Sequence, residues 1–478
     1  MVKEDFVKEV TSRDEDFSRW YVDVVRKSEL ADYSSIKGCM IIKPYGYELW
    51  ENIKNSLDKM IRDTGHRNAY FPLFVPESLL KREAEHVEGF APEVAWITHG
   101  GDEELEERIA IRPTSEAIIC DAYSQWVQSW RDLPILINQW ANVVRWEKVT
   151  RLFLRTREFL WQEGHTAHAT QEEAEAEALK MLEVYRAFSE DVLAMPVIAG
   201  QKSEGQKFPG AVCTYAVEAL MSNGWALQAG TSHNLGQHFA KVFNIQYLDK
   251  NQQQQYVWQT SWGVSTRLIG GVIMTHGDNS GLILPPKIAP IQVIIVPIIF
   301  DKTKGLVLSK VDELARSISQ IARVETDIRD EYTPGWKFSE WEMKGVPIRI
   351  EVGPRDVNNQ QVVMVRRDTR EKTIVKETDL QNEIKLRLDD IQASLFQKAK
   401  KFRDDNTYEV DSFEQFENIM SQGRGFVRAN WCGSAECENQ IQEITTATIR
   451  CIQSSTPTGK CVHCGENGRY MVYFAKAY

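Results

Sequence analysis

Residues 153–165 read Phe-Leu-Arg-Thr-Arg-Glu-Phe-Leu-Trp-Gln-Glu-Gly-His, and they follow the triplet Arg145-Trp146-Glu147 across a short loop. The stretch 135–165 alternates strand-like runs with this arginine-rich loop, which predicts antiparallel hairpins. Its clustered arginines concentrate positive charge as a polyphosphate requires, and aromatic neighbours offer a surface for a base. An Arg-x-Glu triplet alone usually belongs to a solvated hairpin with ion pairs; the surrounding run argues against that alternative.

A second arginine stands where a strand is expected to run into a helix. Residues 262–271 read Trp-Gly-Val-Ser-Thr-Arg-Leu-Ile-Gly-Gly, with a strand expected over 257–265 and a helix over 266–276. Helix N-termini favour anionic groups, so Ser265 and Arg267 are candidates for phosphate contacts. Taken alone, a purely structural arginine is an equal alternative.

Two further loops suit a small amino acid. Arg-Pro-Thr-Ser-Glu at 112–116 places the Thr114 hydroxyl and the Glu116 carboxylate two residues apart, which suits a substrate ammonium group. A loop that caps a helix is the simpler explanation of this segment by itself. Gln-Ala-Gly-Thr-Ser-His at 228–233 sets small residues beside a histidine, where an isolated histidine is more often structural.

The eight cysteines are unevenly placed, and five crowd the C-terminal end: Cys432, Cys437, Cys451, Cys461 and Cys464. Clustering of this kind, without an export signal, favours a metal over disulfides. The pairs Cys432-x4-Cys437 and Cys461-x2-Cys464 give a closed four-sulfur set for structural Zn²⁺ that leaves no position for a catalytic water. Cys451 and His463 are alternative ligands.

Hydrophobic spacing predicts the helices and strands around these segments. Leu49, Ile53, Leu57 and Ile61 recur every four residues after Pro44, which indicates an amphipathic helix over 44–64. Apolar residues over 68–76 indicate a strand, and a Thr170/Glu173 capping box opens a helix to about Ala194. Beyond residue 286, strands at 291–300, 348–352 and 362–366 and helices at 305–322 and 380–402 predict a mixed α/β region.

The length of 478 residues and this change of pattern predict three domains, 1–285, 286–403 and 404–478. The net charge of -11 argues against nucleic-acid binding over the whole surface. Residues 344–376 stand out, because eight Lys or Arg face four acids there, a net of +4. A local basic patch is therefore expected in the second domain.

The order and spacing of these segments resemble the three motifs of class II aminoacyl-tRNA synthetases. The Arg145 hairpin corresponds to motif 2, the Arg267 segment to motif 3, and the helix at 44–64 with its following strand to motif 1. Together with Arg-Pro-Thr-Ser-Glu and Gly-Thr-Ser-His, the run 153–165 is very close to the prolyl-tRNA synthetase family of the archaeal and eukaryote-like type, over essentially the whole chain. The resemblance implies a multidomain α+β and α/β fold: a class II antiparallel sheet with flanking helices, a mixed α/β anticodon-binding domain and a small zinc-containing C-terminal domain.

The same resemblance implies ATP-dependent formation of prolyl-adenylate with release of pyrophosphate, then transfer of proline to the 3′-terminal ribose of tRNA(Pro). Arg145 and Arg267 would neutralise charge in the catalytic step. The implied proline contacts are Thr114, Glu116, Arg145, Trp161, Glu163, His165, Phe208, Ser232 and His233. The implied ATP contacts are Arg145, Glu147, Arg155, Thr156, Phe159, Gln228, Thr231, Ser265 and Arg267.

Cofactors and partners follow from the resemblance as expectations: ATP as substrate, Mg²⁺, structural Zn²⁺ on Cys432, Cys437, Cys461 and Cys464, tRNA(Pro), and a second copy of the chain bound through the motif 1 helix and strand. The basic stretch would read unstacked anticodon bases. Its candidate residues are Trp336, Lys344, Arg349 and Arg355. The terminal Tyr478 would tuck towards the active site, with a frayed end as the alternative.

No apolar run reaches the roughly 18 residues of a membrane span, and the N-terminus lacks a signal pattern, so a cytoplasmic enzyme without a membrane partner is expected. The chain has no room for a large editing insertion between motifs 2 and 3. One methylene is worth only about 1–3 kcal/mol in an apolar pocket, so alanine and cysteine are expected to be activated by mistake at some rate. We predict no hydrolytic correction of alanine within this chain.

Three alternatives stay open at this point. One is the same reaction with another amino acid, such as threonine or glycine. Another is a catalytically silent paralogue that binds RNA or regulates; such a protein loses its motif arginines without cost, whereas Arg145, Arg155 and Arg267 are all present here. The third is an unrelated zinc-stabilised RNA-binding protein, which would not be expected to bind ATP.

Overall fold

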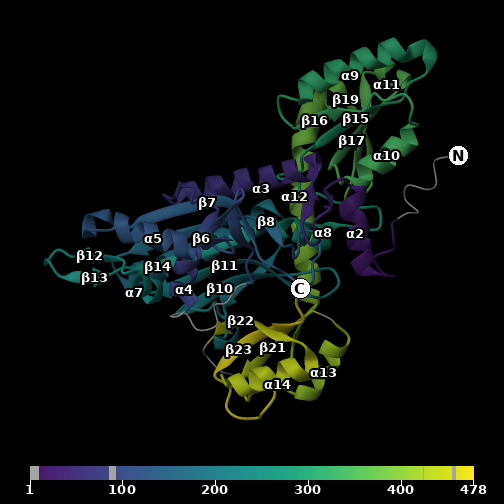
Figure 1. Ribbon diagram of the computed structural model, residues 1–478. Helices are drawn as coiled ribbons and strands as arrows, with labels where there is room; N and C mark the ends of the chain where they lie inside the picture. The colour runs from purple at the N-terminus through teal and green to yellow at the C-terminus, as the bar shows by residue number, and fades with distance from the viewer. Residues whose placement is uncertain (1–9, 85–92, 424, 455–458) are drawn as a thin grey trace.

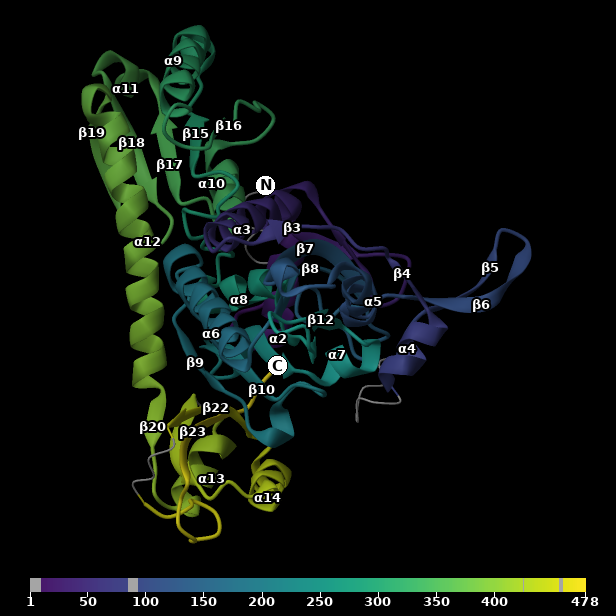
Figure 2. The ribbon, with the colours of Figure 1, turned by 90° about the vertical axis from the view of Figure 1, so that its left-hand side faces the viewer.

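A computed structural model of the chain describes residues 10–84, 93–423, 425–454 and 459–478 (Figure 1). A long helix, α12, runs between a five-stranded region at one end and a small C-terminal region at the other (Figures 1 and 2). The largest region lies beside the middle of this helix. Among the described residues, none of the helices combines the length and the apolar character needed to cross a bilayer.

The largest region is built on an antiparallel sheet. Near one edge of this sheet, an antiparallel hairpin pairs Ile135 with Ala167 at one end and Val144 with Glu158 at the other. The sequence predicted antiparallel hairpins in this stretch. A short strand pairs with this hairpin in parallel at the sheet edge. In spatial order the strands are β3 (Arg67–Asn68), β7 (Ile135–Val144), β8 (Glu158–His168), β14 (Trp258–Ser265), β11 (Ala226–Gly236), β10 (Cys213–Leu220) and β9 (Val197–Gln201).

Helices cover this sheet and bury apolar side chains in the same core. The predicted motif 1 helix is confirmed, with Leu49, Ile53, Leu57 and Ile61 fully buried. The helix after the sheet hairpin begins at the predicted cap, where Thr170 accepts a hydrogen bond from the Glu173 amide. The covering helices are α3 (Pro44–Asp63), α6 (Gln171–Ala187) and α8 (Arg267–His276), and α2 (Phe17–Lys27) packs into the same core.

The strand predicted over 68–76 is largely wrong. Only residues 67–68 and 74–76 pair as strands. Between them, side chains satisfy the backbone: the Phe71 amide donates to Gln139 Oε1 at 2.5 Å, and the Phe71 carbonyl accepts from Arg112 Nη1 at 2.7 Å. Pro72 has no N–H to offer a neighbouring strand.

Smaller elements complete this region. A three-stranded sheet runs β4-β6-β5, and its β5–β6 hairpin projects away from the body (Figure 2). The elements are β1 (Ala31–Tyr33), β2 (Met40–Ile42), β4 (Phe74–Pro76), α4 (Glu77–Ala84), β5 (Trp96–Gly100), β6 (Glu103–Ile111), α5 (Glu116–Trp126), α7 (His238–Phe243), β12 (Gln246–Leu248) and β13 (Gln254–Tyr256).

The second region is a mixed five-stranded sheet in the order β16-β15-β17-β18-β19, with its own buried core. Strands and helices alternate here, as the sequence predicted, and the sheet contains both parallel and antiparallel pairs. Its elements are β15 (Val293–Pro297), α9 (Lys304–Ile318), β16 (Val324–Thr326), α10 (Pro334–Met343), β17 (Ile348–Val352), α11 (Pro354–Asn358), β18 (Gln361–Arg366), β19 (Lys372–Lys376) and α12 (Leu380–Asp405).

The C-terminal region extends the central sheet. Its strand β22 pairs with β9 at Ile452 and Gln201. The described strands of the two regions therefore form one eleven-stranded sheet, in which β20-β21-β23-β22 continues into β9 and the strands given above. This continuity places the C-terminal region in the same sheet as the strands that carry the cavity described below. The elements are β20 (Thr407–Glu409), α13 (Phe413–Ser421), β21 (Phe426–Trp431), α14 (Ala435–Thr445), β22 (Thr448–Ser454) and β23 (Tyr470–Ala475).

Candidate active site

A cavity of about 320 Å³ opens on one face of the central sheet, where β8, β14 and β11 are neighbours. Segments far apart in the sequence meet in its wall. Of the residues proposed from the sequence for proline and ATP, the wall contains Thr114, Glu116, Arg145, Phe159, Trp161, Glu163, His165, Phe208, Gln228, Thr231, His233, Ser265 and Arg267.

Strand β8 supplies alternate side chains to this wall: Phe159, Trp161, Glu163 and His165. Because side chains alternate across a strand, the residues between them face the opposite side of the sheet. Gln162, for example, hydrogen-bonds Tyr185 of the covering helix α6 at 2.6 Å.

One end of the cavity is a network of polar groups around a buried carboxylate. Glu163 accepts hydrogen bonds from the Ser115 hydroxyl at 2.5 Å and the Gln139 amide at 2.8 Å, and His165 Nε2 lies 2.9 Å from its other oxygen. Burial alone would raise the pKa of Glu163, yet its histidine partner and these donors hold it below its ordinary value. Burial opposes the charged form of His165, and the contact with Glu163 outweighs it and raises the His165 pKa.

His233 faces the same end of the cavity as a neutral imidazole. Burial, with the charge of His165 nearby, lowers its pKa to about 3. Its Nδ1 lies 2.9 Å from the Thr214 hydroxyl, and its ring lies 4.8 Å from the Phe208 ring, centroid to centroid. A second carboxylate, Glu116, is also buried there and accepts a short hydrogen bond from Thr114. This end therefore offers carboxylates, a neutral imidazole and aromatic surface to a small zwitterion.

The other end carries guanidinium groups anchored by backbone carbonyls. Arg145 Nε donates to the Pro113 carbonyl at 3.0 Å, and Arg267 Nε donates to the Leu154 carbonyl at 3.1 Å. Within the described part of the chain, neither has a carboxylate at ion-pairing distance. Burial and the charges of Arg155 and Arg145 lower the pKa of Arg267 to about 10, and partial loss of solvent around its guanidinium lowers the pKa of Arg145, whose side chain is open to the cavity. Anionic groups of a ligand would relieve both effects.

Aromatic rings lie beside these cations. The Arg145 guanidinium is 5.5 Å from the ring centroids of both Phe159 and Trp161. The two rings meet edge to face at 6.1 Å. A guanidinium group and an aromatic surface, the combination that the sequence suggested for phosphates and a base, therefore lie side by side in one cavity.

Four of the residues proposed from the sequence do not line the cavity: Glu147, Arg155, Thr156 and Ser232. Arg155 is exposed beside it, near enough that its charge lowers the Arg267 pKa. The Thr156 hydroxyl donates to the Glu158 carbonyl at 2.6 Å. Ser232 points to the opposite side of the sheet and donates to the Ala178 carbonyl of α6 at 2.7 Å, so its side chain does not reach the cavity.

Sequence reasoning also missed residues in and behind the wall. Gln206 and Lys207 line the cavity from the connection between β9 and β10, and Thr214 lies opposite His233 in the strand register. Ser115 and Gln139 hold Glu163 from behind. Ser115 stands within the quoted 112–116 segment, but the sequence shows no sign that Gln139 or Thr214 lies beside the same site.

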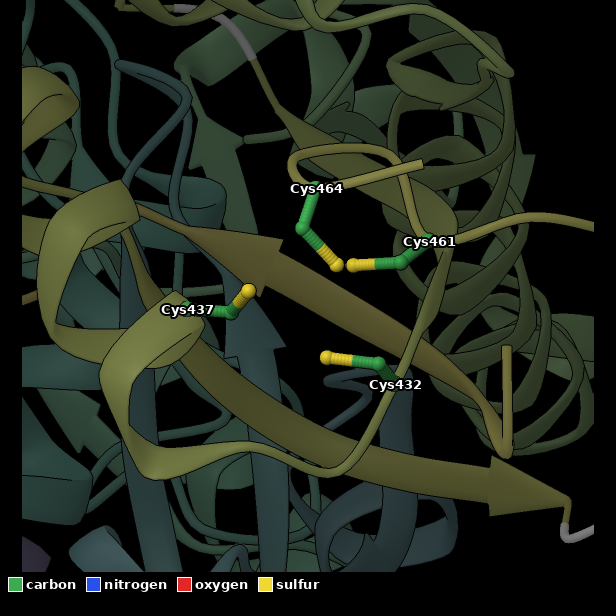
Figure 3. A group of neighbouring side chains, drawn as sticks. All are labelled: Cys432, Cys437, Cys461 and Cys464. Carbon is green, nitrogen blue, oxygen red and sulfur yellow. The ribbon is translucent and has the colours of Figure 1, made fainter. Parts of the chain in front are cut away.

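Four cysteine sulfurs converge between β21, α14 and the loop before β23 (Figure 3). The Sγ atoms of Cys432, Cys437, Cys461 and Cys464 all lie within 4.8 Å of one another. A zinc–sulfur distance of about 2.3 Å in a tetrahedron places sulfurs about 3.8 Å apart, so the cluster fits a zinc site. The alternative ligand Cys451 lies elsewhere: its sulfur is buried against the Ile198 carbonyl at 3.7 Å.

The basic stretch of the second region is largely neutralised by acids. Arg349 pairs with Glu351 at 2.9 Å and with Glu342 at 3.0 Å, and it is buried. Arg367 reaches Asp278 of the first region at 2.6 Å. The expected basic patch is therefore smaller than the sequence count suggests, since several of these charges serve the fold.

The four anticodon candidates have different surroundings. Lys344 forms an ion pair with Glu29 of the first region at 2.6 Å. The Trp336 ring stacks on Tyr332 at 3.9 Å, with Arg329 over both rings. Arg355 is exposed on α11, whereas Arg349 is buried, as described above.

The chain end is docked rather than frayed. The Tyr478 amide donates to the Ala226 carbonyl at 3.1 Å, and its hydroxyl contacts the Asn223 amide at 2.8 Å. Burial raises the Tyr478 pKa to about 12. Ala226 begins the strand that also carries Gln228 of the cavity wall, so the terminal tyrosine lies close to the cavity-bearing sheet.

Three family models match the chain in succession. A class II tRNA synthetase core domain (G, H, P, S and T) matches residues 96–276, an anticodon-binding domain matches 292–387, and a prolyl-tRNA synthetase C-terminal domain matches 413–478. The three matches follow the order of the largest, five-stranded and C-terminal regions.

Similar proteins cover the whole chain. A proline–tRNA ligase from Natranaerobius thermophilus is 58% identical over 99% of each chain. Another, from Alkaliphilus oremlandii, is 58% identical over 99% of this chain and 98% of the relative. The crystal structure of a prolyl-tRNA synthetase from Cryptosporidium parvum, complexed with halofuginone and AMPPNP, matches with a TM-score of 0.93 and 42% identity over 98% of this chain and 99% of that one.

Proposed function

This chain belongs to the class II prolyl-tRNA synthetases, the enzymes that attach L-proline to tRNA(Pro) with ATP, and we propose how its cavity divides that chemistry. Proline binds at the Glu163–His233 end and the ATP phosphates bind at the Arg145–Arg267 end. The observation that carries this division is the contrast between the two ends: carboxylates and a neutral imidazole at one, guanidinium groups without carboxylate partners at the other.

At the proline end, the secondary ammonium group is received by Thr114 and Glu116, and Glu163 and His165 support this arrangement from the next strand. Phe208, Trp161 and the His233 ring enclose the pyrrolidine ring. Carboxylates suit a cationic amine, and aromatic faces suit both its charge and its methylenes. The Ser232 side chain is left out of this assignment because it faces α6.

At the nucleotide end, Arg145 holds the α-phosphate and Arg267 the γ-phosphate, with Phe159 stacked on adenine. Gln228, Thr231 and Ser265 complete the contacts, while Glu147, Arg155 and Thr156 bind from the rim of the cavity. AMPPNP, an ATP analogue, is present in the similar Cryptosporidium parvum structure. Mg²⁺ bound to the triphosphate would offset part of its charge.

The reaction needs no side-chain nucleophile. The proline carboxylate attacks the α-phosphorus, the bond to the bridging oxygen breaks, and pyrophosphate leaves with that electron pair. The terminal ribose hydroxyl of tRNA(Pro) then attacks the prolyl carbonyl and releases AMP. The protein contributes by holding the reactants in line and by neutralising the charge that develops on the phosphates.

Other parts of the chain serve this reaction from outside the cavity. We divide the chain into a catalytic domain (1–285), an anticodon-binding domain (286–403) and a zinc-binding domain (404–478). Zn²⁺ bound by the four cysteines would have four sulfur ligands and no open position, which makes its role structural. Anticodon contacts are best sought at the exposed Arg355 and at the Trp336 stack. The enzyme works in the cytoplasm, where tRNA is charged for translation.

We also propose a homodimer through the motif 1 helix and the segment after it. Large apolar side chains are exposed there: Tyr70 is 70% and Phe74 49% exposed, and Trp126, 49% exposed, packs on Phe71. Exposed apolar groups of this size favour a partner surface, and two-fold pairing is the commonest closed assembly.

The experiment that tests the substrate assignment is ATP–pyrophosphate exchange with a panel of amino acids. We expect exchange with proline, weak exchange with alanine and cysteine, and none with threonine or glycine. Faster exchange with threonine or glycine than with proline would refute the assignment of the cavity. A companion assay with alanine-charged tRNA(Pro) should show no release of alanine beyond the uncatalysed rate, because we assign no hydrolytic site to this chain.

A further inference from the structure

The connection between β9 and β10 forms one side of the proline end of the cavity. Gln206, Lys207 and Phe208 from this connection line the wall. The Phe208 amide donates to the Thr214 hydroxyl at 2.9 Å, and that hydroxyl is also 2.9 Å from His233 Nδ1. The position of this segment therefore bears on both the aromatic surface and the imidazole at that end.

The start of the same segment is held by the C-terminal region. The Ser203 hydroxyl donates to Glu438 Oε1 at 2.6 Å, across 235 residues of sequence. Both side chains are buried, with Ser203 1% and Glu438 4% exposed. Gly205 lies against the same carboxylate, since a Cβ there would stand 3.4 Å from Glu438 Oε2.

A second buried contact fixes the neighbouring residue. Lys202 donates to Glu218 Oε1 at 2.5 Å, and Arg450 of β22 reaches both oxygens of Glu218 at 2.9 Å. Taking these charges out of water is tolerated only while they stay paired, so this contact resists displacement. Glu438 of the C-terminal region thus contacts the segment before Phe208 directly, and Arg450 is linked to Lys202 through Glu218 of β10.

We propose that Glu438 is a positioning residue for proline binding. Its hydrogen bond to Ser203 fixes the segment 203–208 and thereby sets Phe208 and, through Thr214, His233. This inference rests on the proposed assignment of proline to that end of the cavity. It gives the C-terminal region a role in substrate affinity that is separate from any contact with tRNA.

The test compares steady-state exchange kinetics of variants at this contact with a matched control. Ser203→Ala and Glu438→Ala remove the bond, Glu438→Gln keeps an oxygen that accepts from Ser203, and Glu443→Ala removes an exposed carboxylate from the same helix. We expect KM for proline to rise at least about fivefold in both disrupting variants, with kcat and KM for ATP within about twofold. Glu438→Gln should recover most of the affinity, and Glu443→Ala should match wild type.

The double variant Ser203→Ala/Glu438→Ala should raise KM for proline no further than the single variant with the larger effect, because both substitutions remove the same interaction. Hydrogen–deuterium exchange should speed up in peptides spanning 203–208 and stay unchanged in β14. The proposal is overturned if Ser203→Ala, the smallest change, leaves the proline KM unchanged, if the two effects add, or if KM for ATP rises equally. Wild-type protein that shows no proline-dependent exchange would instead overturn the assignment of the cavity.

Discussion

Arg145 and Arg267 point into the cavity and, among the described residues, have no carboxylate at ion-pairing distance, whereas Arg349, Arg366 and Arg367 of the five-stranded region are buried against acids. Arg366 pairs with Asp368 at 2.8 Å and with Asp390, and Arg367 pairs with Asp278. The arginine charges in the cavity are available to an anionic ligand, whereas those of the five-stranded region form ion pairs that stabilise the fold. Arginine content alone therefore does not locate a binding surface, because the pairing decides its use.

The largest effect on folding is expected at a paired arginine. Arg366→Ala leaves the buried Asp368 without its partner, so the five-stranded region should lose about 3–5 kcal/mol of stability. Urea dependence of hydrogen exchange in β17 and β18 measures this loss. At low urea, the rate of proline-dependent ATP–pyrophosphate exchange by the variant should stay within about twofold of the wild-type rate. A loss under about 1 kcal/mol would mean that this pair is not structural.

The opposite pattern, a large loss of activity with little loss of stability, is expected at an arginine without a carboxylate partner. Arg267→Ala should lower kcat/KM for ATP by about 10²–10³-fold, as expected for one group that stabilises charge in the transition state. Stability should change by less than about 1 kcal/mol, since no buried carboxylate is left alone. Exchange kinetics and thermal unfolding of the same preparation measure the two quantities. A strongly destabilised variant with normal kinetics would place Arg267 with the structural arginines.

A carboxylate inside the cavity sharpens the comparison, because Glu163 is paired with His165 and still lines the cavity. In Glu163→Gln, burial of His165 is opposed only by the more distant Glu116, so the His165 pKa should fall below its ordinary value of 6.5. Titration of the histidine signals by NMR, with His165→Ala for assignment, measures this shift. KM for proline should rise about tenfold, since a charged hydrogen-bonding group is lost. A His165 pKa that stays raised would contradict the pairing.

The pH dependence of stability follows from the same pair. Glu163 has a lowered pKa, so its contribution is complete above its ordinary value of 4.5 and is lost as the pH falls through the lowered pKa. His165 has a raised pKa, so its contribution is complete below 6.5 and is lost as the pH rises through the raised pKa. The stability difference between wild type and Glu163→Gln should therefore be largest between pH 4.5 and 6.5. A difference that grows steadily above pH 6.5 would refute this account.

The smallest effect is expected at an exposed arginine of the five-stranded region. Arg355→Ala should leave proline-dependent exchange and stability unchanged and should raise KM for tRNA(Pro) about threefold, through one lost phosphate or base contact. Aminoacylation kinetics at fixed ionic strength measure the change. Equal KM values would remove Arg355 from the tRNA surface and leave the Trp336 stack as the better candidate.

Local sequence patterns predicted much of the structure where one rule decides. The four-residue spacing fixed the buried side of α3, and the Thr170/Glu173 pair marked the start of α6. Alternation along β8 brought four side chains into one wall. The same alternation excludes Ser232 from the cavity wall, because it stands between Thr231 and His233 in a strand. This alternation is a property of the sequence, so it could have excluded Ser232 from the predicted proline contacts.

Other features depend on contacts that no local pattern records. The eight basic residues over 344–376 suggested a patch, but acids as distant as Asp278 and Asp390 neutralise part of it. The strand predicted at 68–76 was interrupted because Gln139 and Arg112 bind its backbone from elsewhere in the chain. Glu438 was not singled out at all, since its partner Ser203 lies 235 residues away.

The most direct test of the central claim is proline-dependent ATP–pyrophosphate exchange by Arg145→Ala beside wild type. Arg145 is assigned to the α-phosphate, where the bond to pyrophosphate breaks, so the account predicts a loss of at least about 10³-fold in a variant that unfolds at the wild-type temperature. Retention of exchange within about tenfold of wild type by the folded variant would contradict the claim that the cavity guanidinium groups hold the nucleotide.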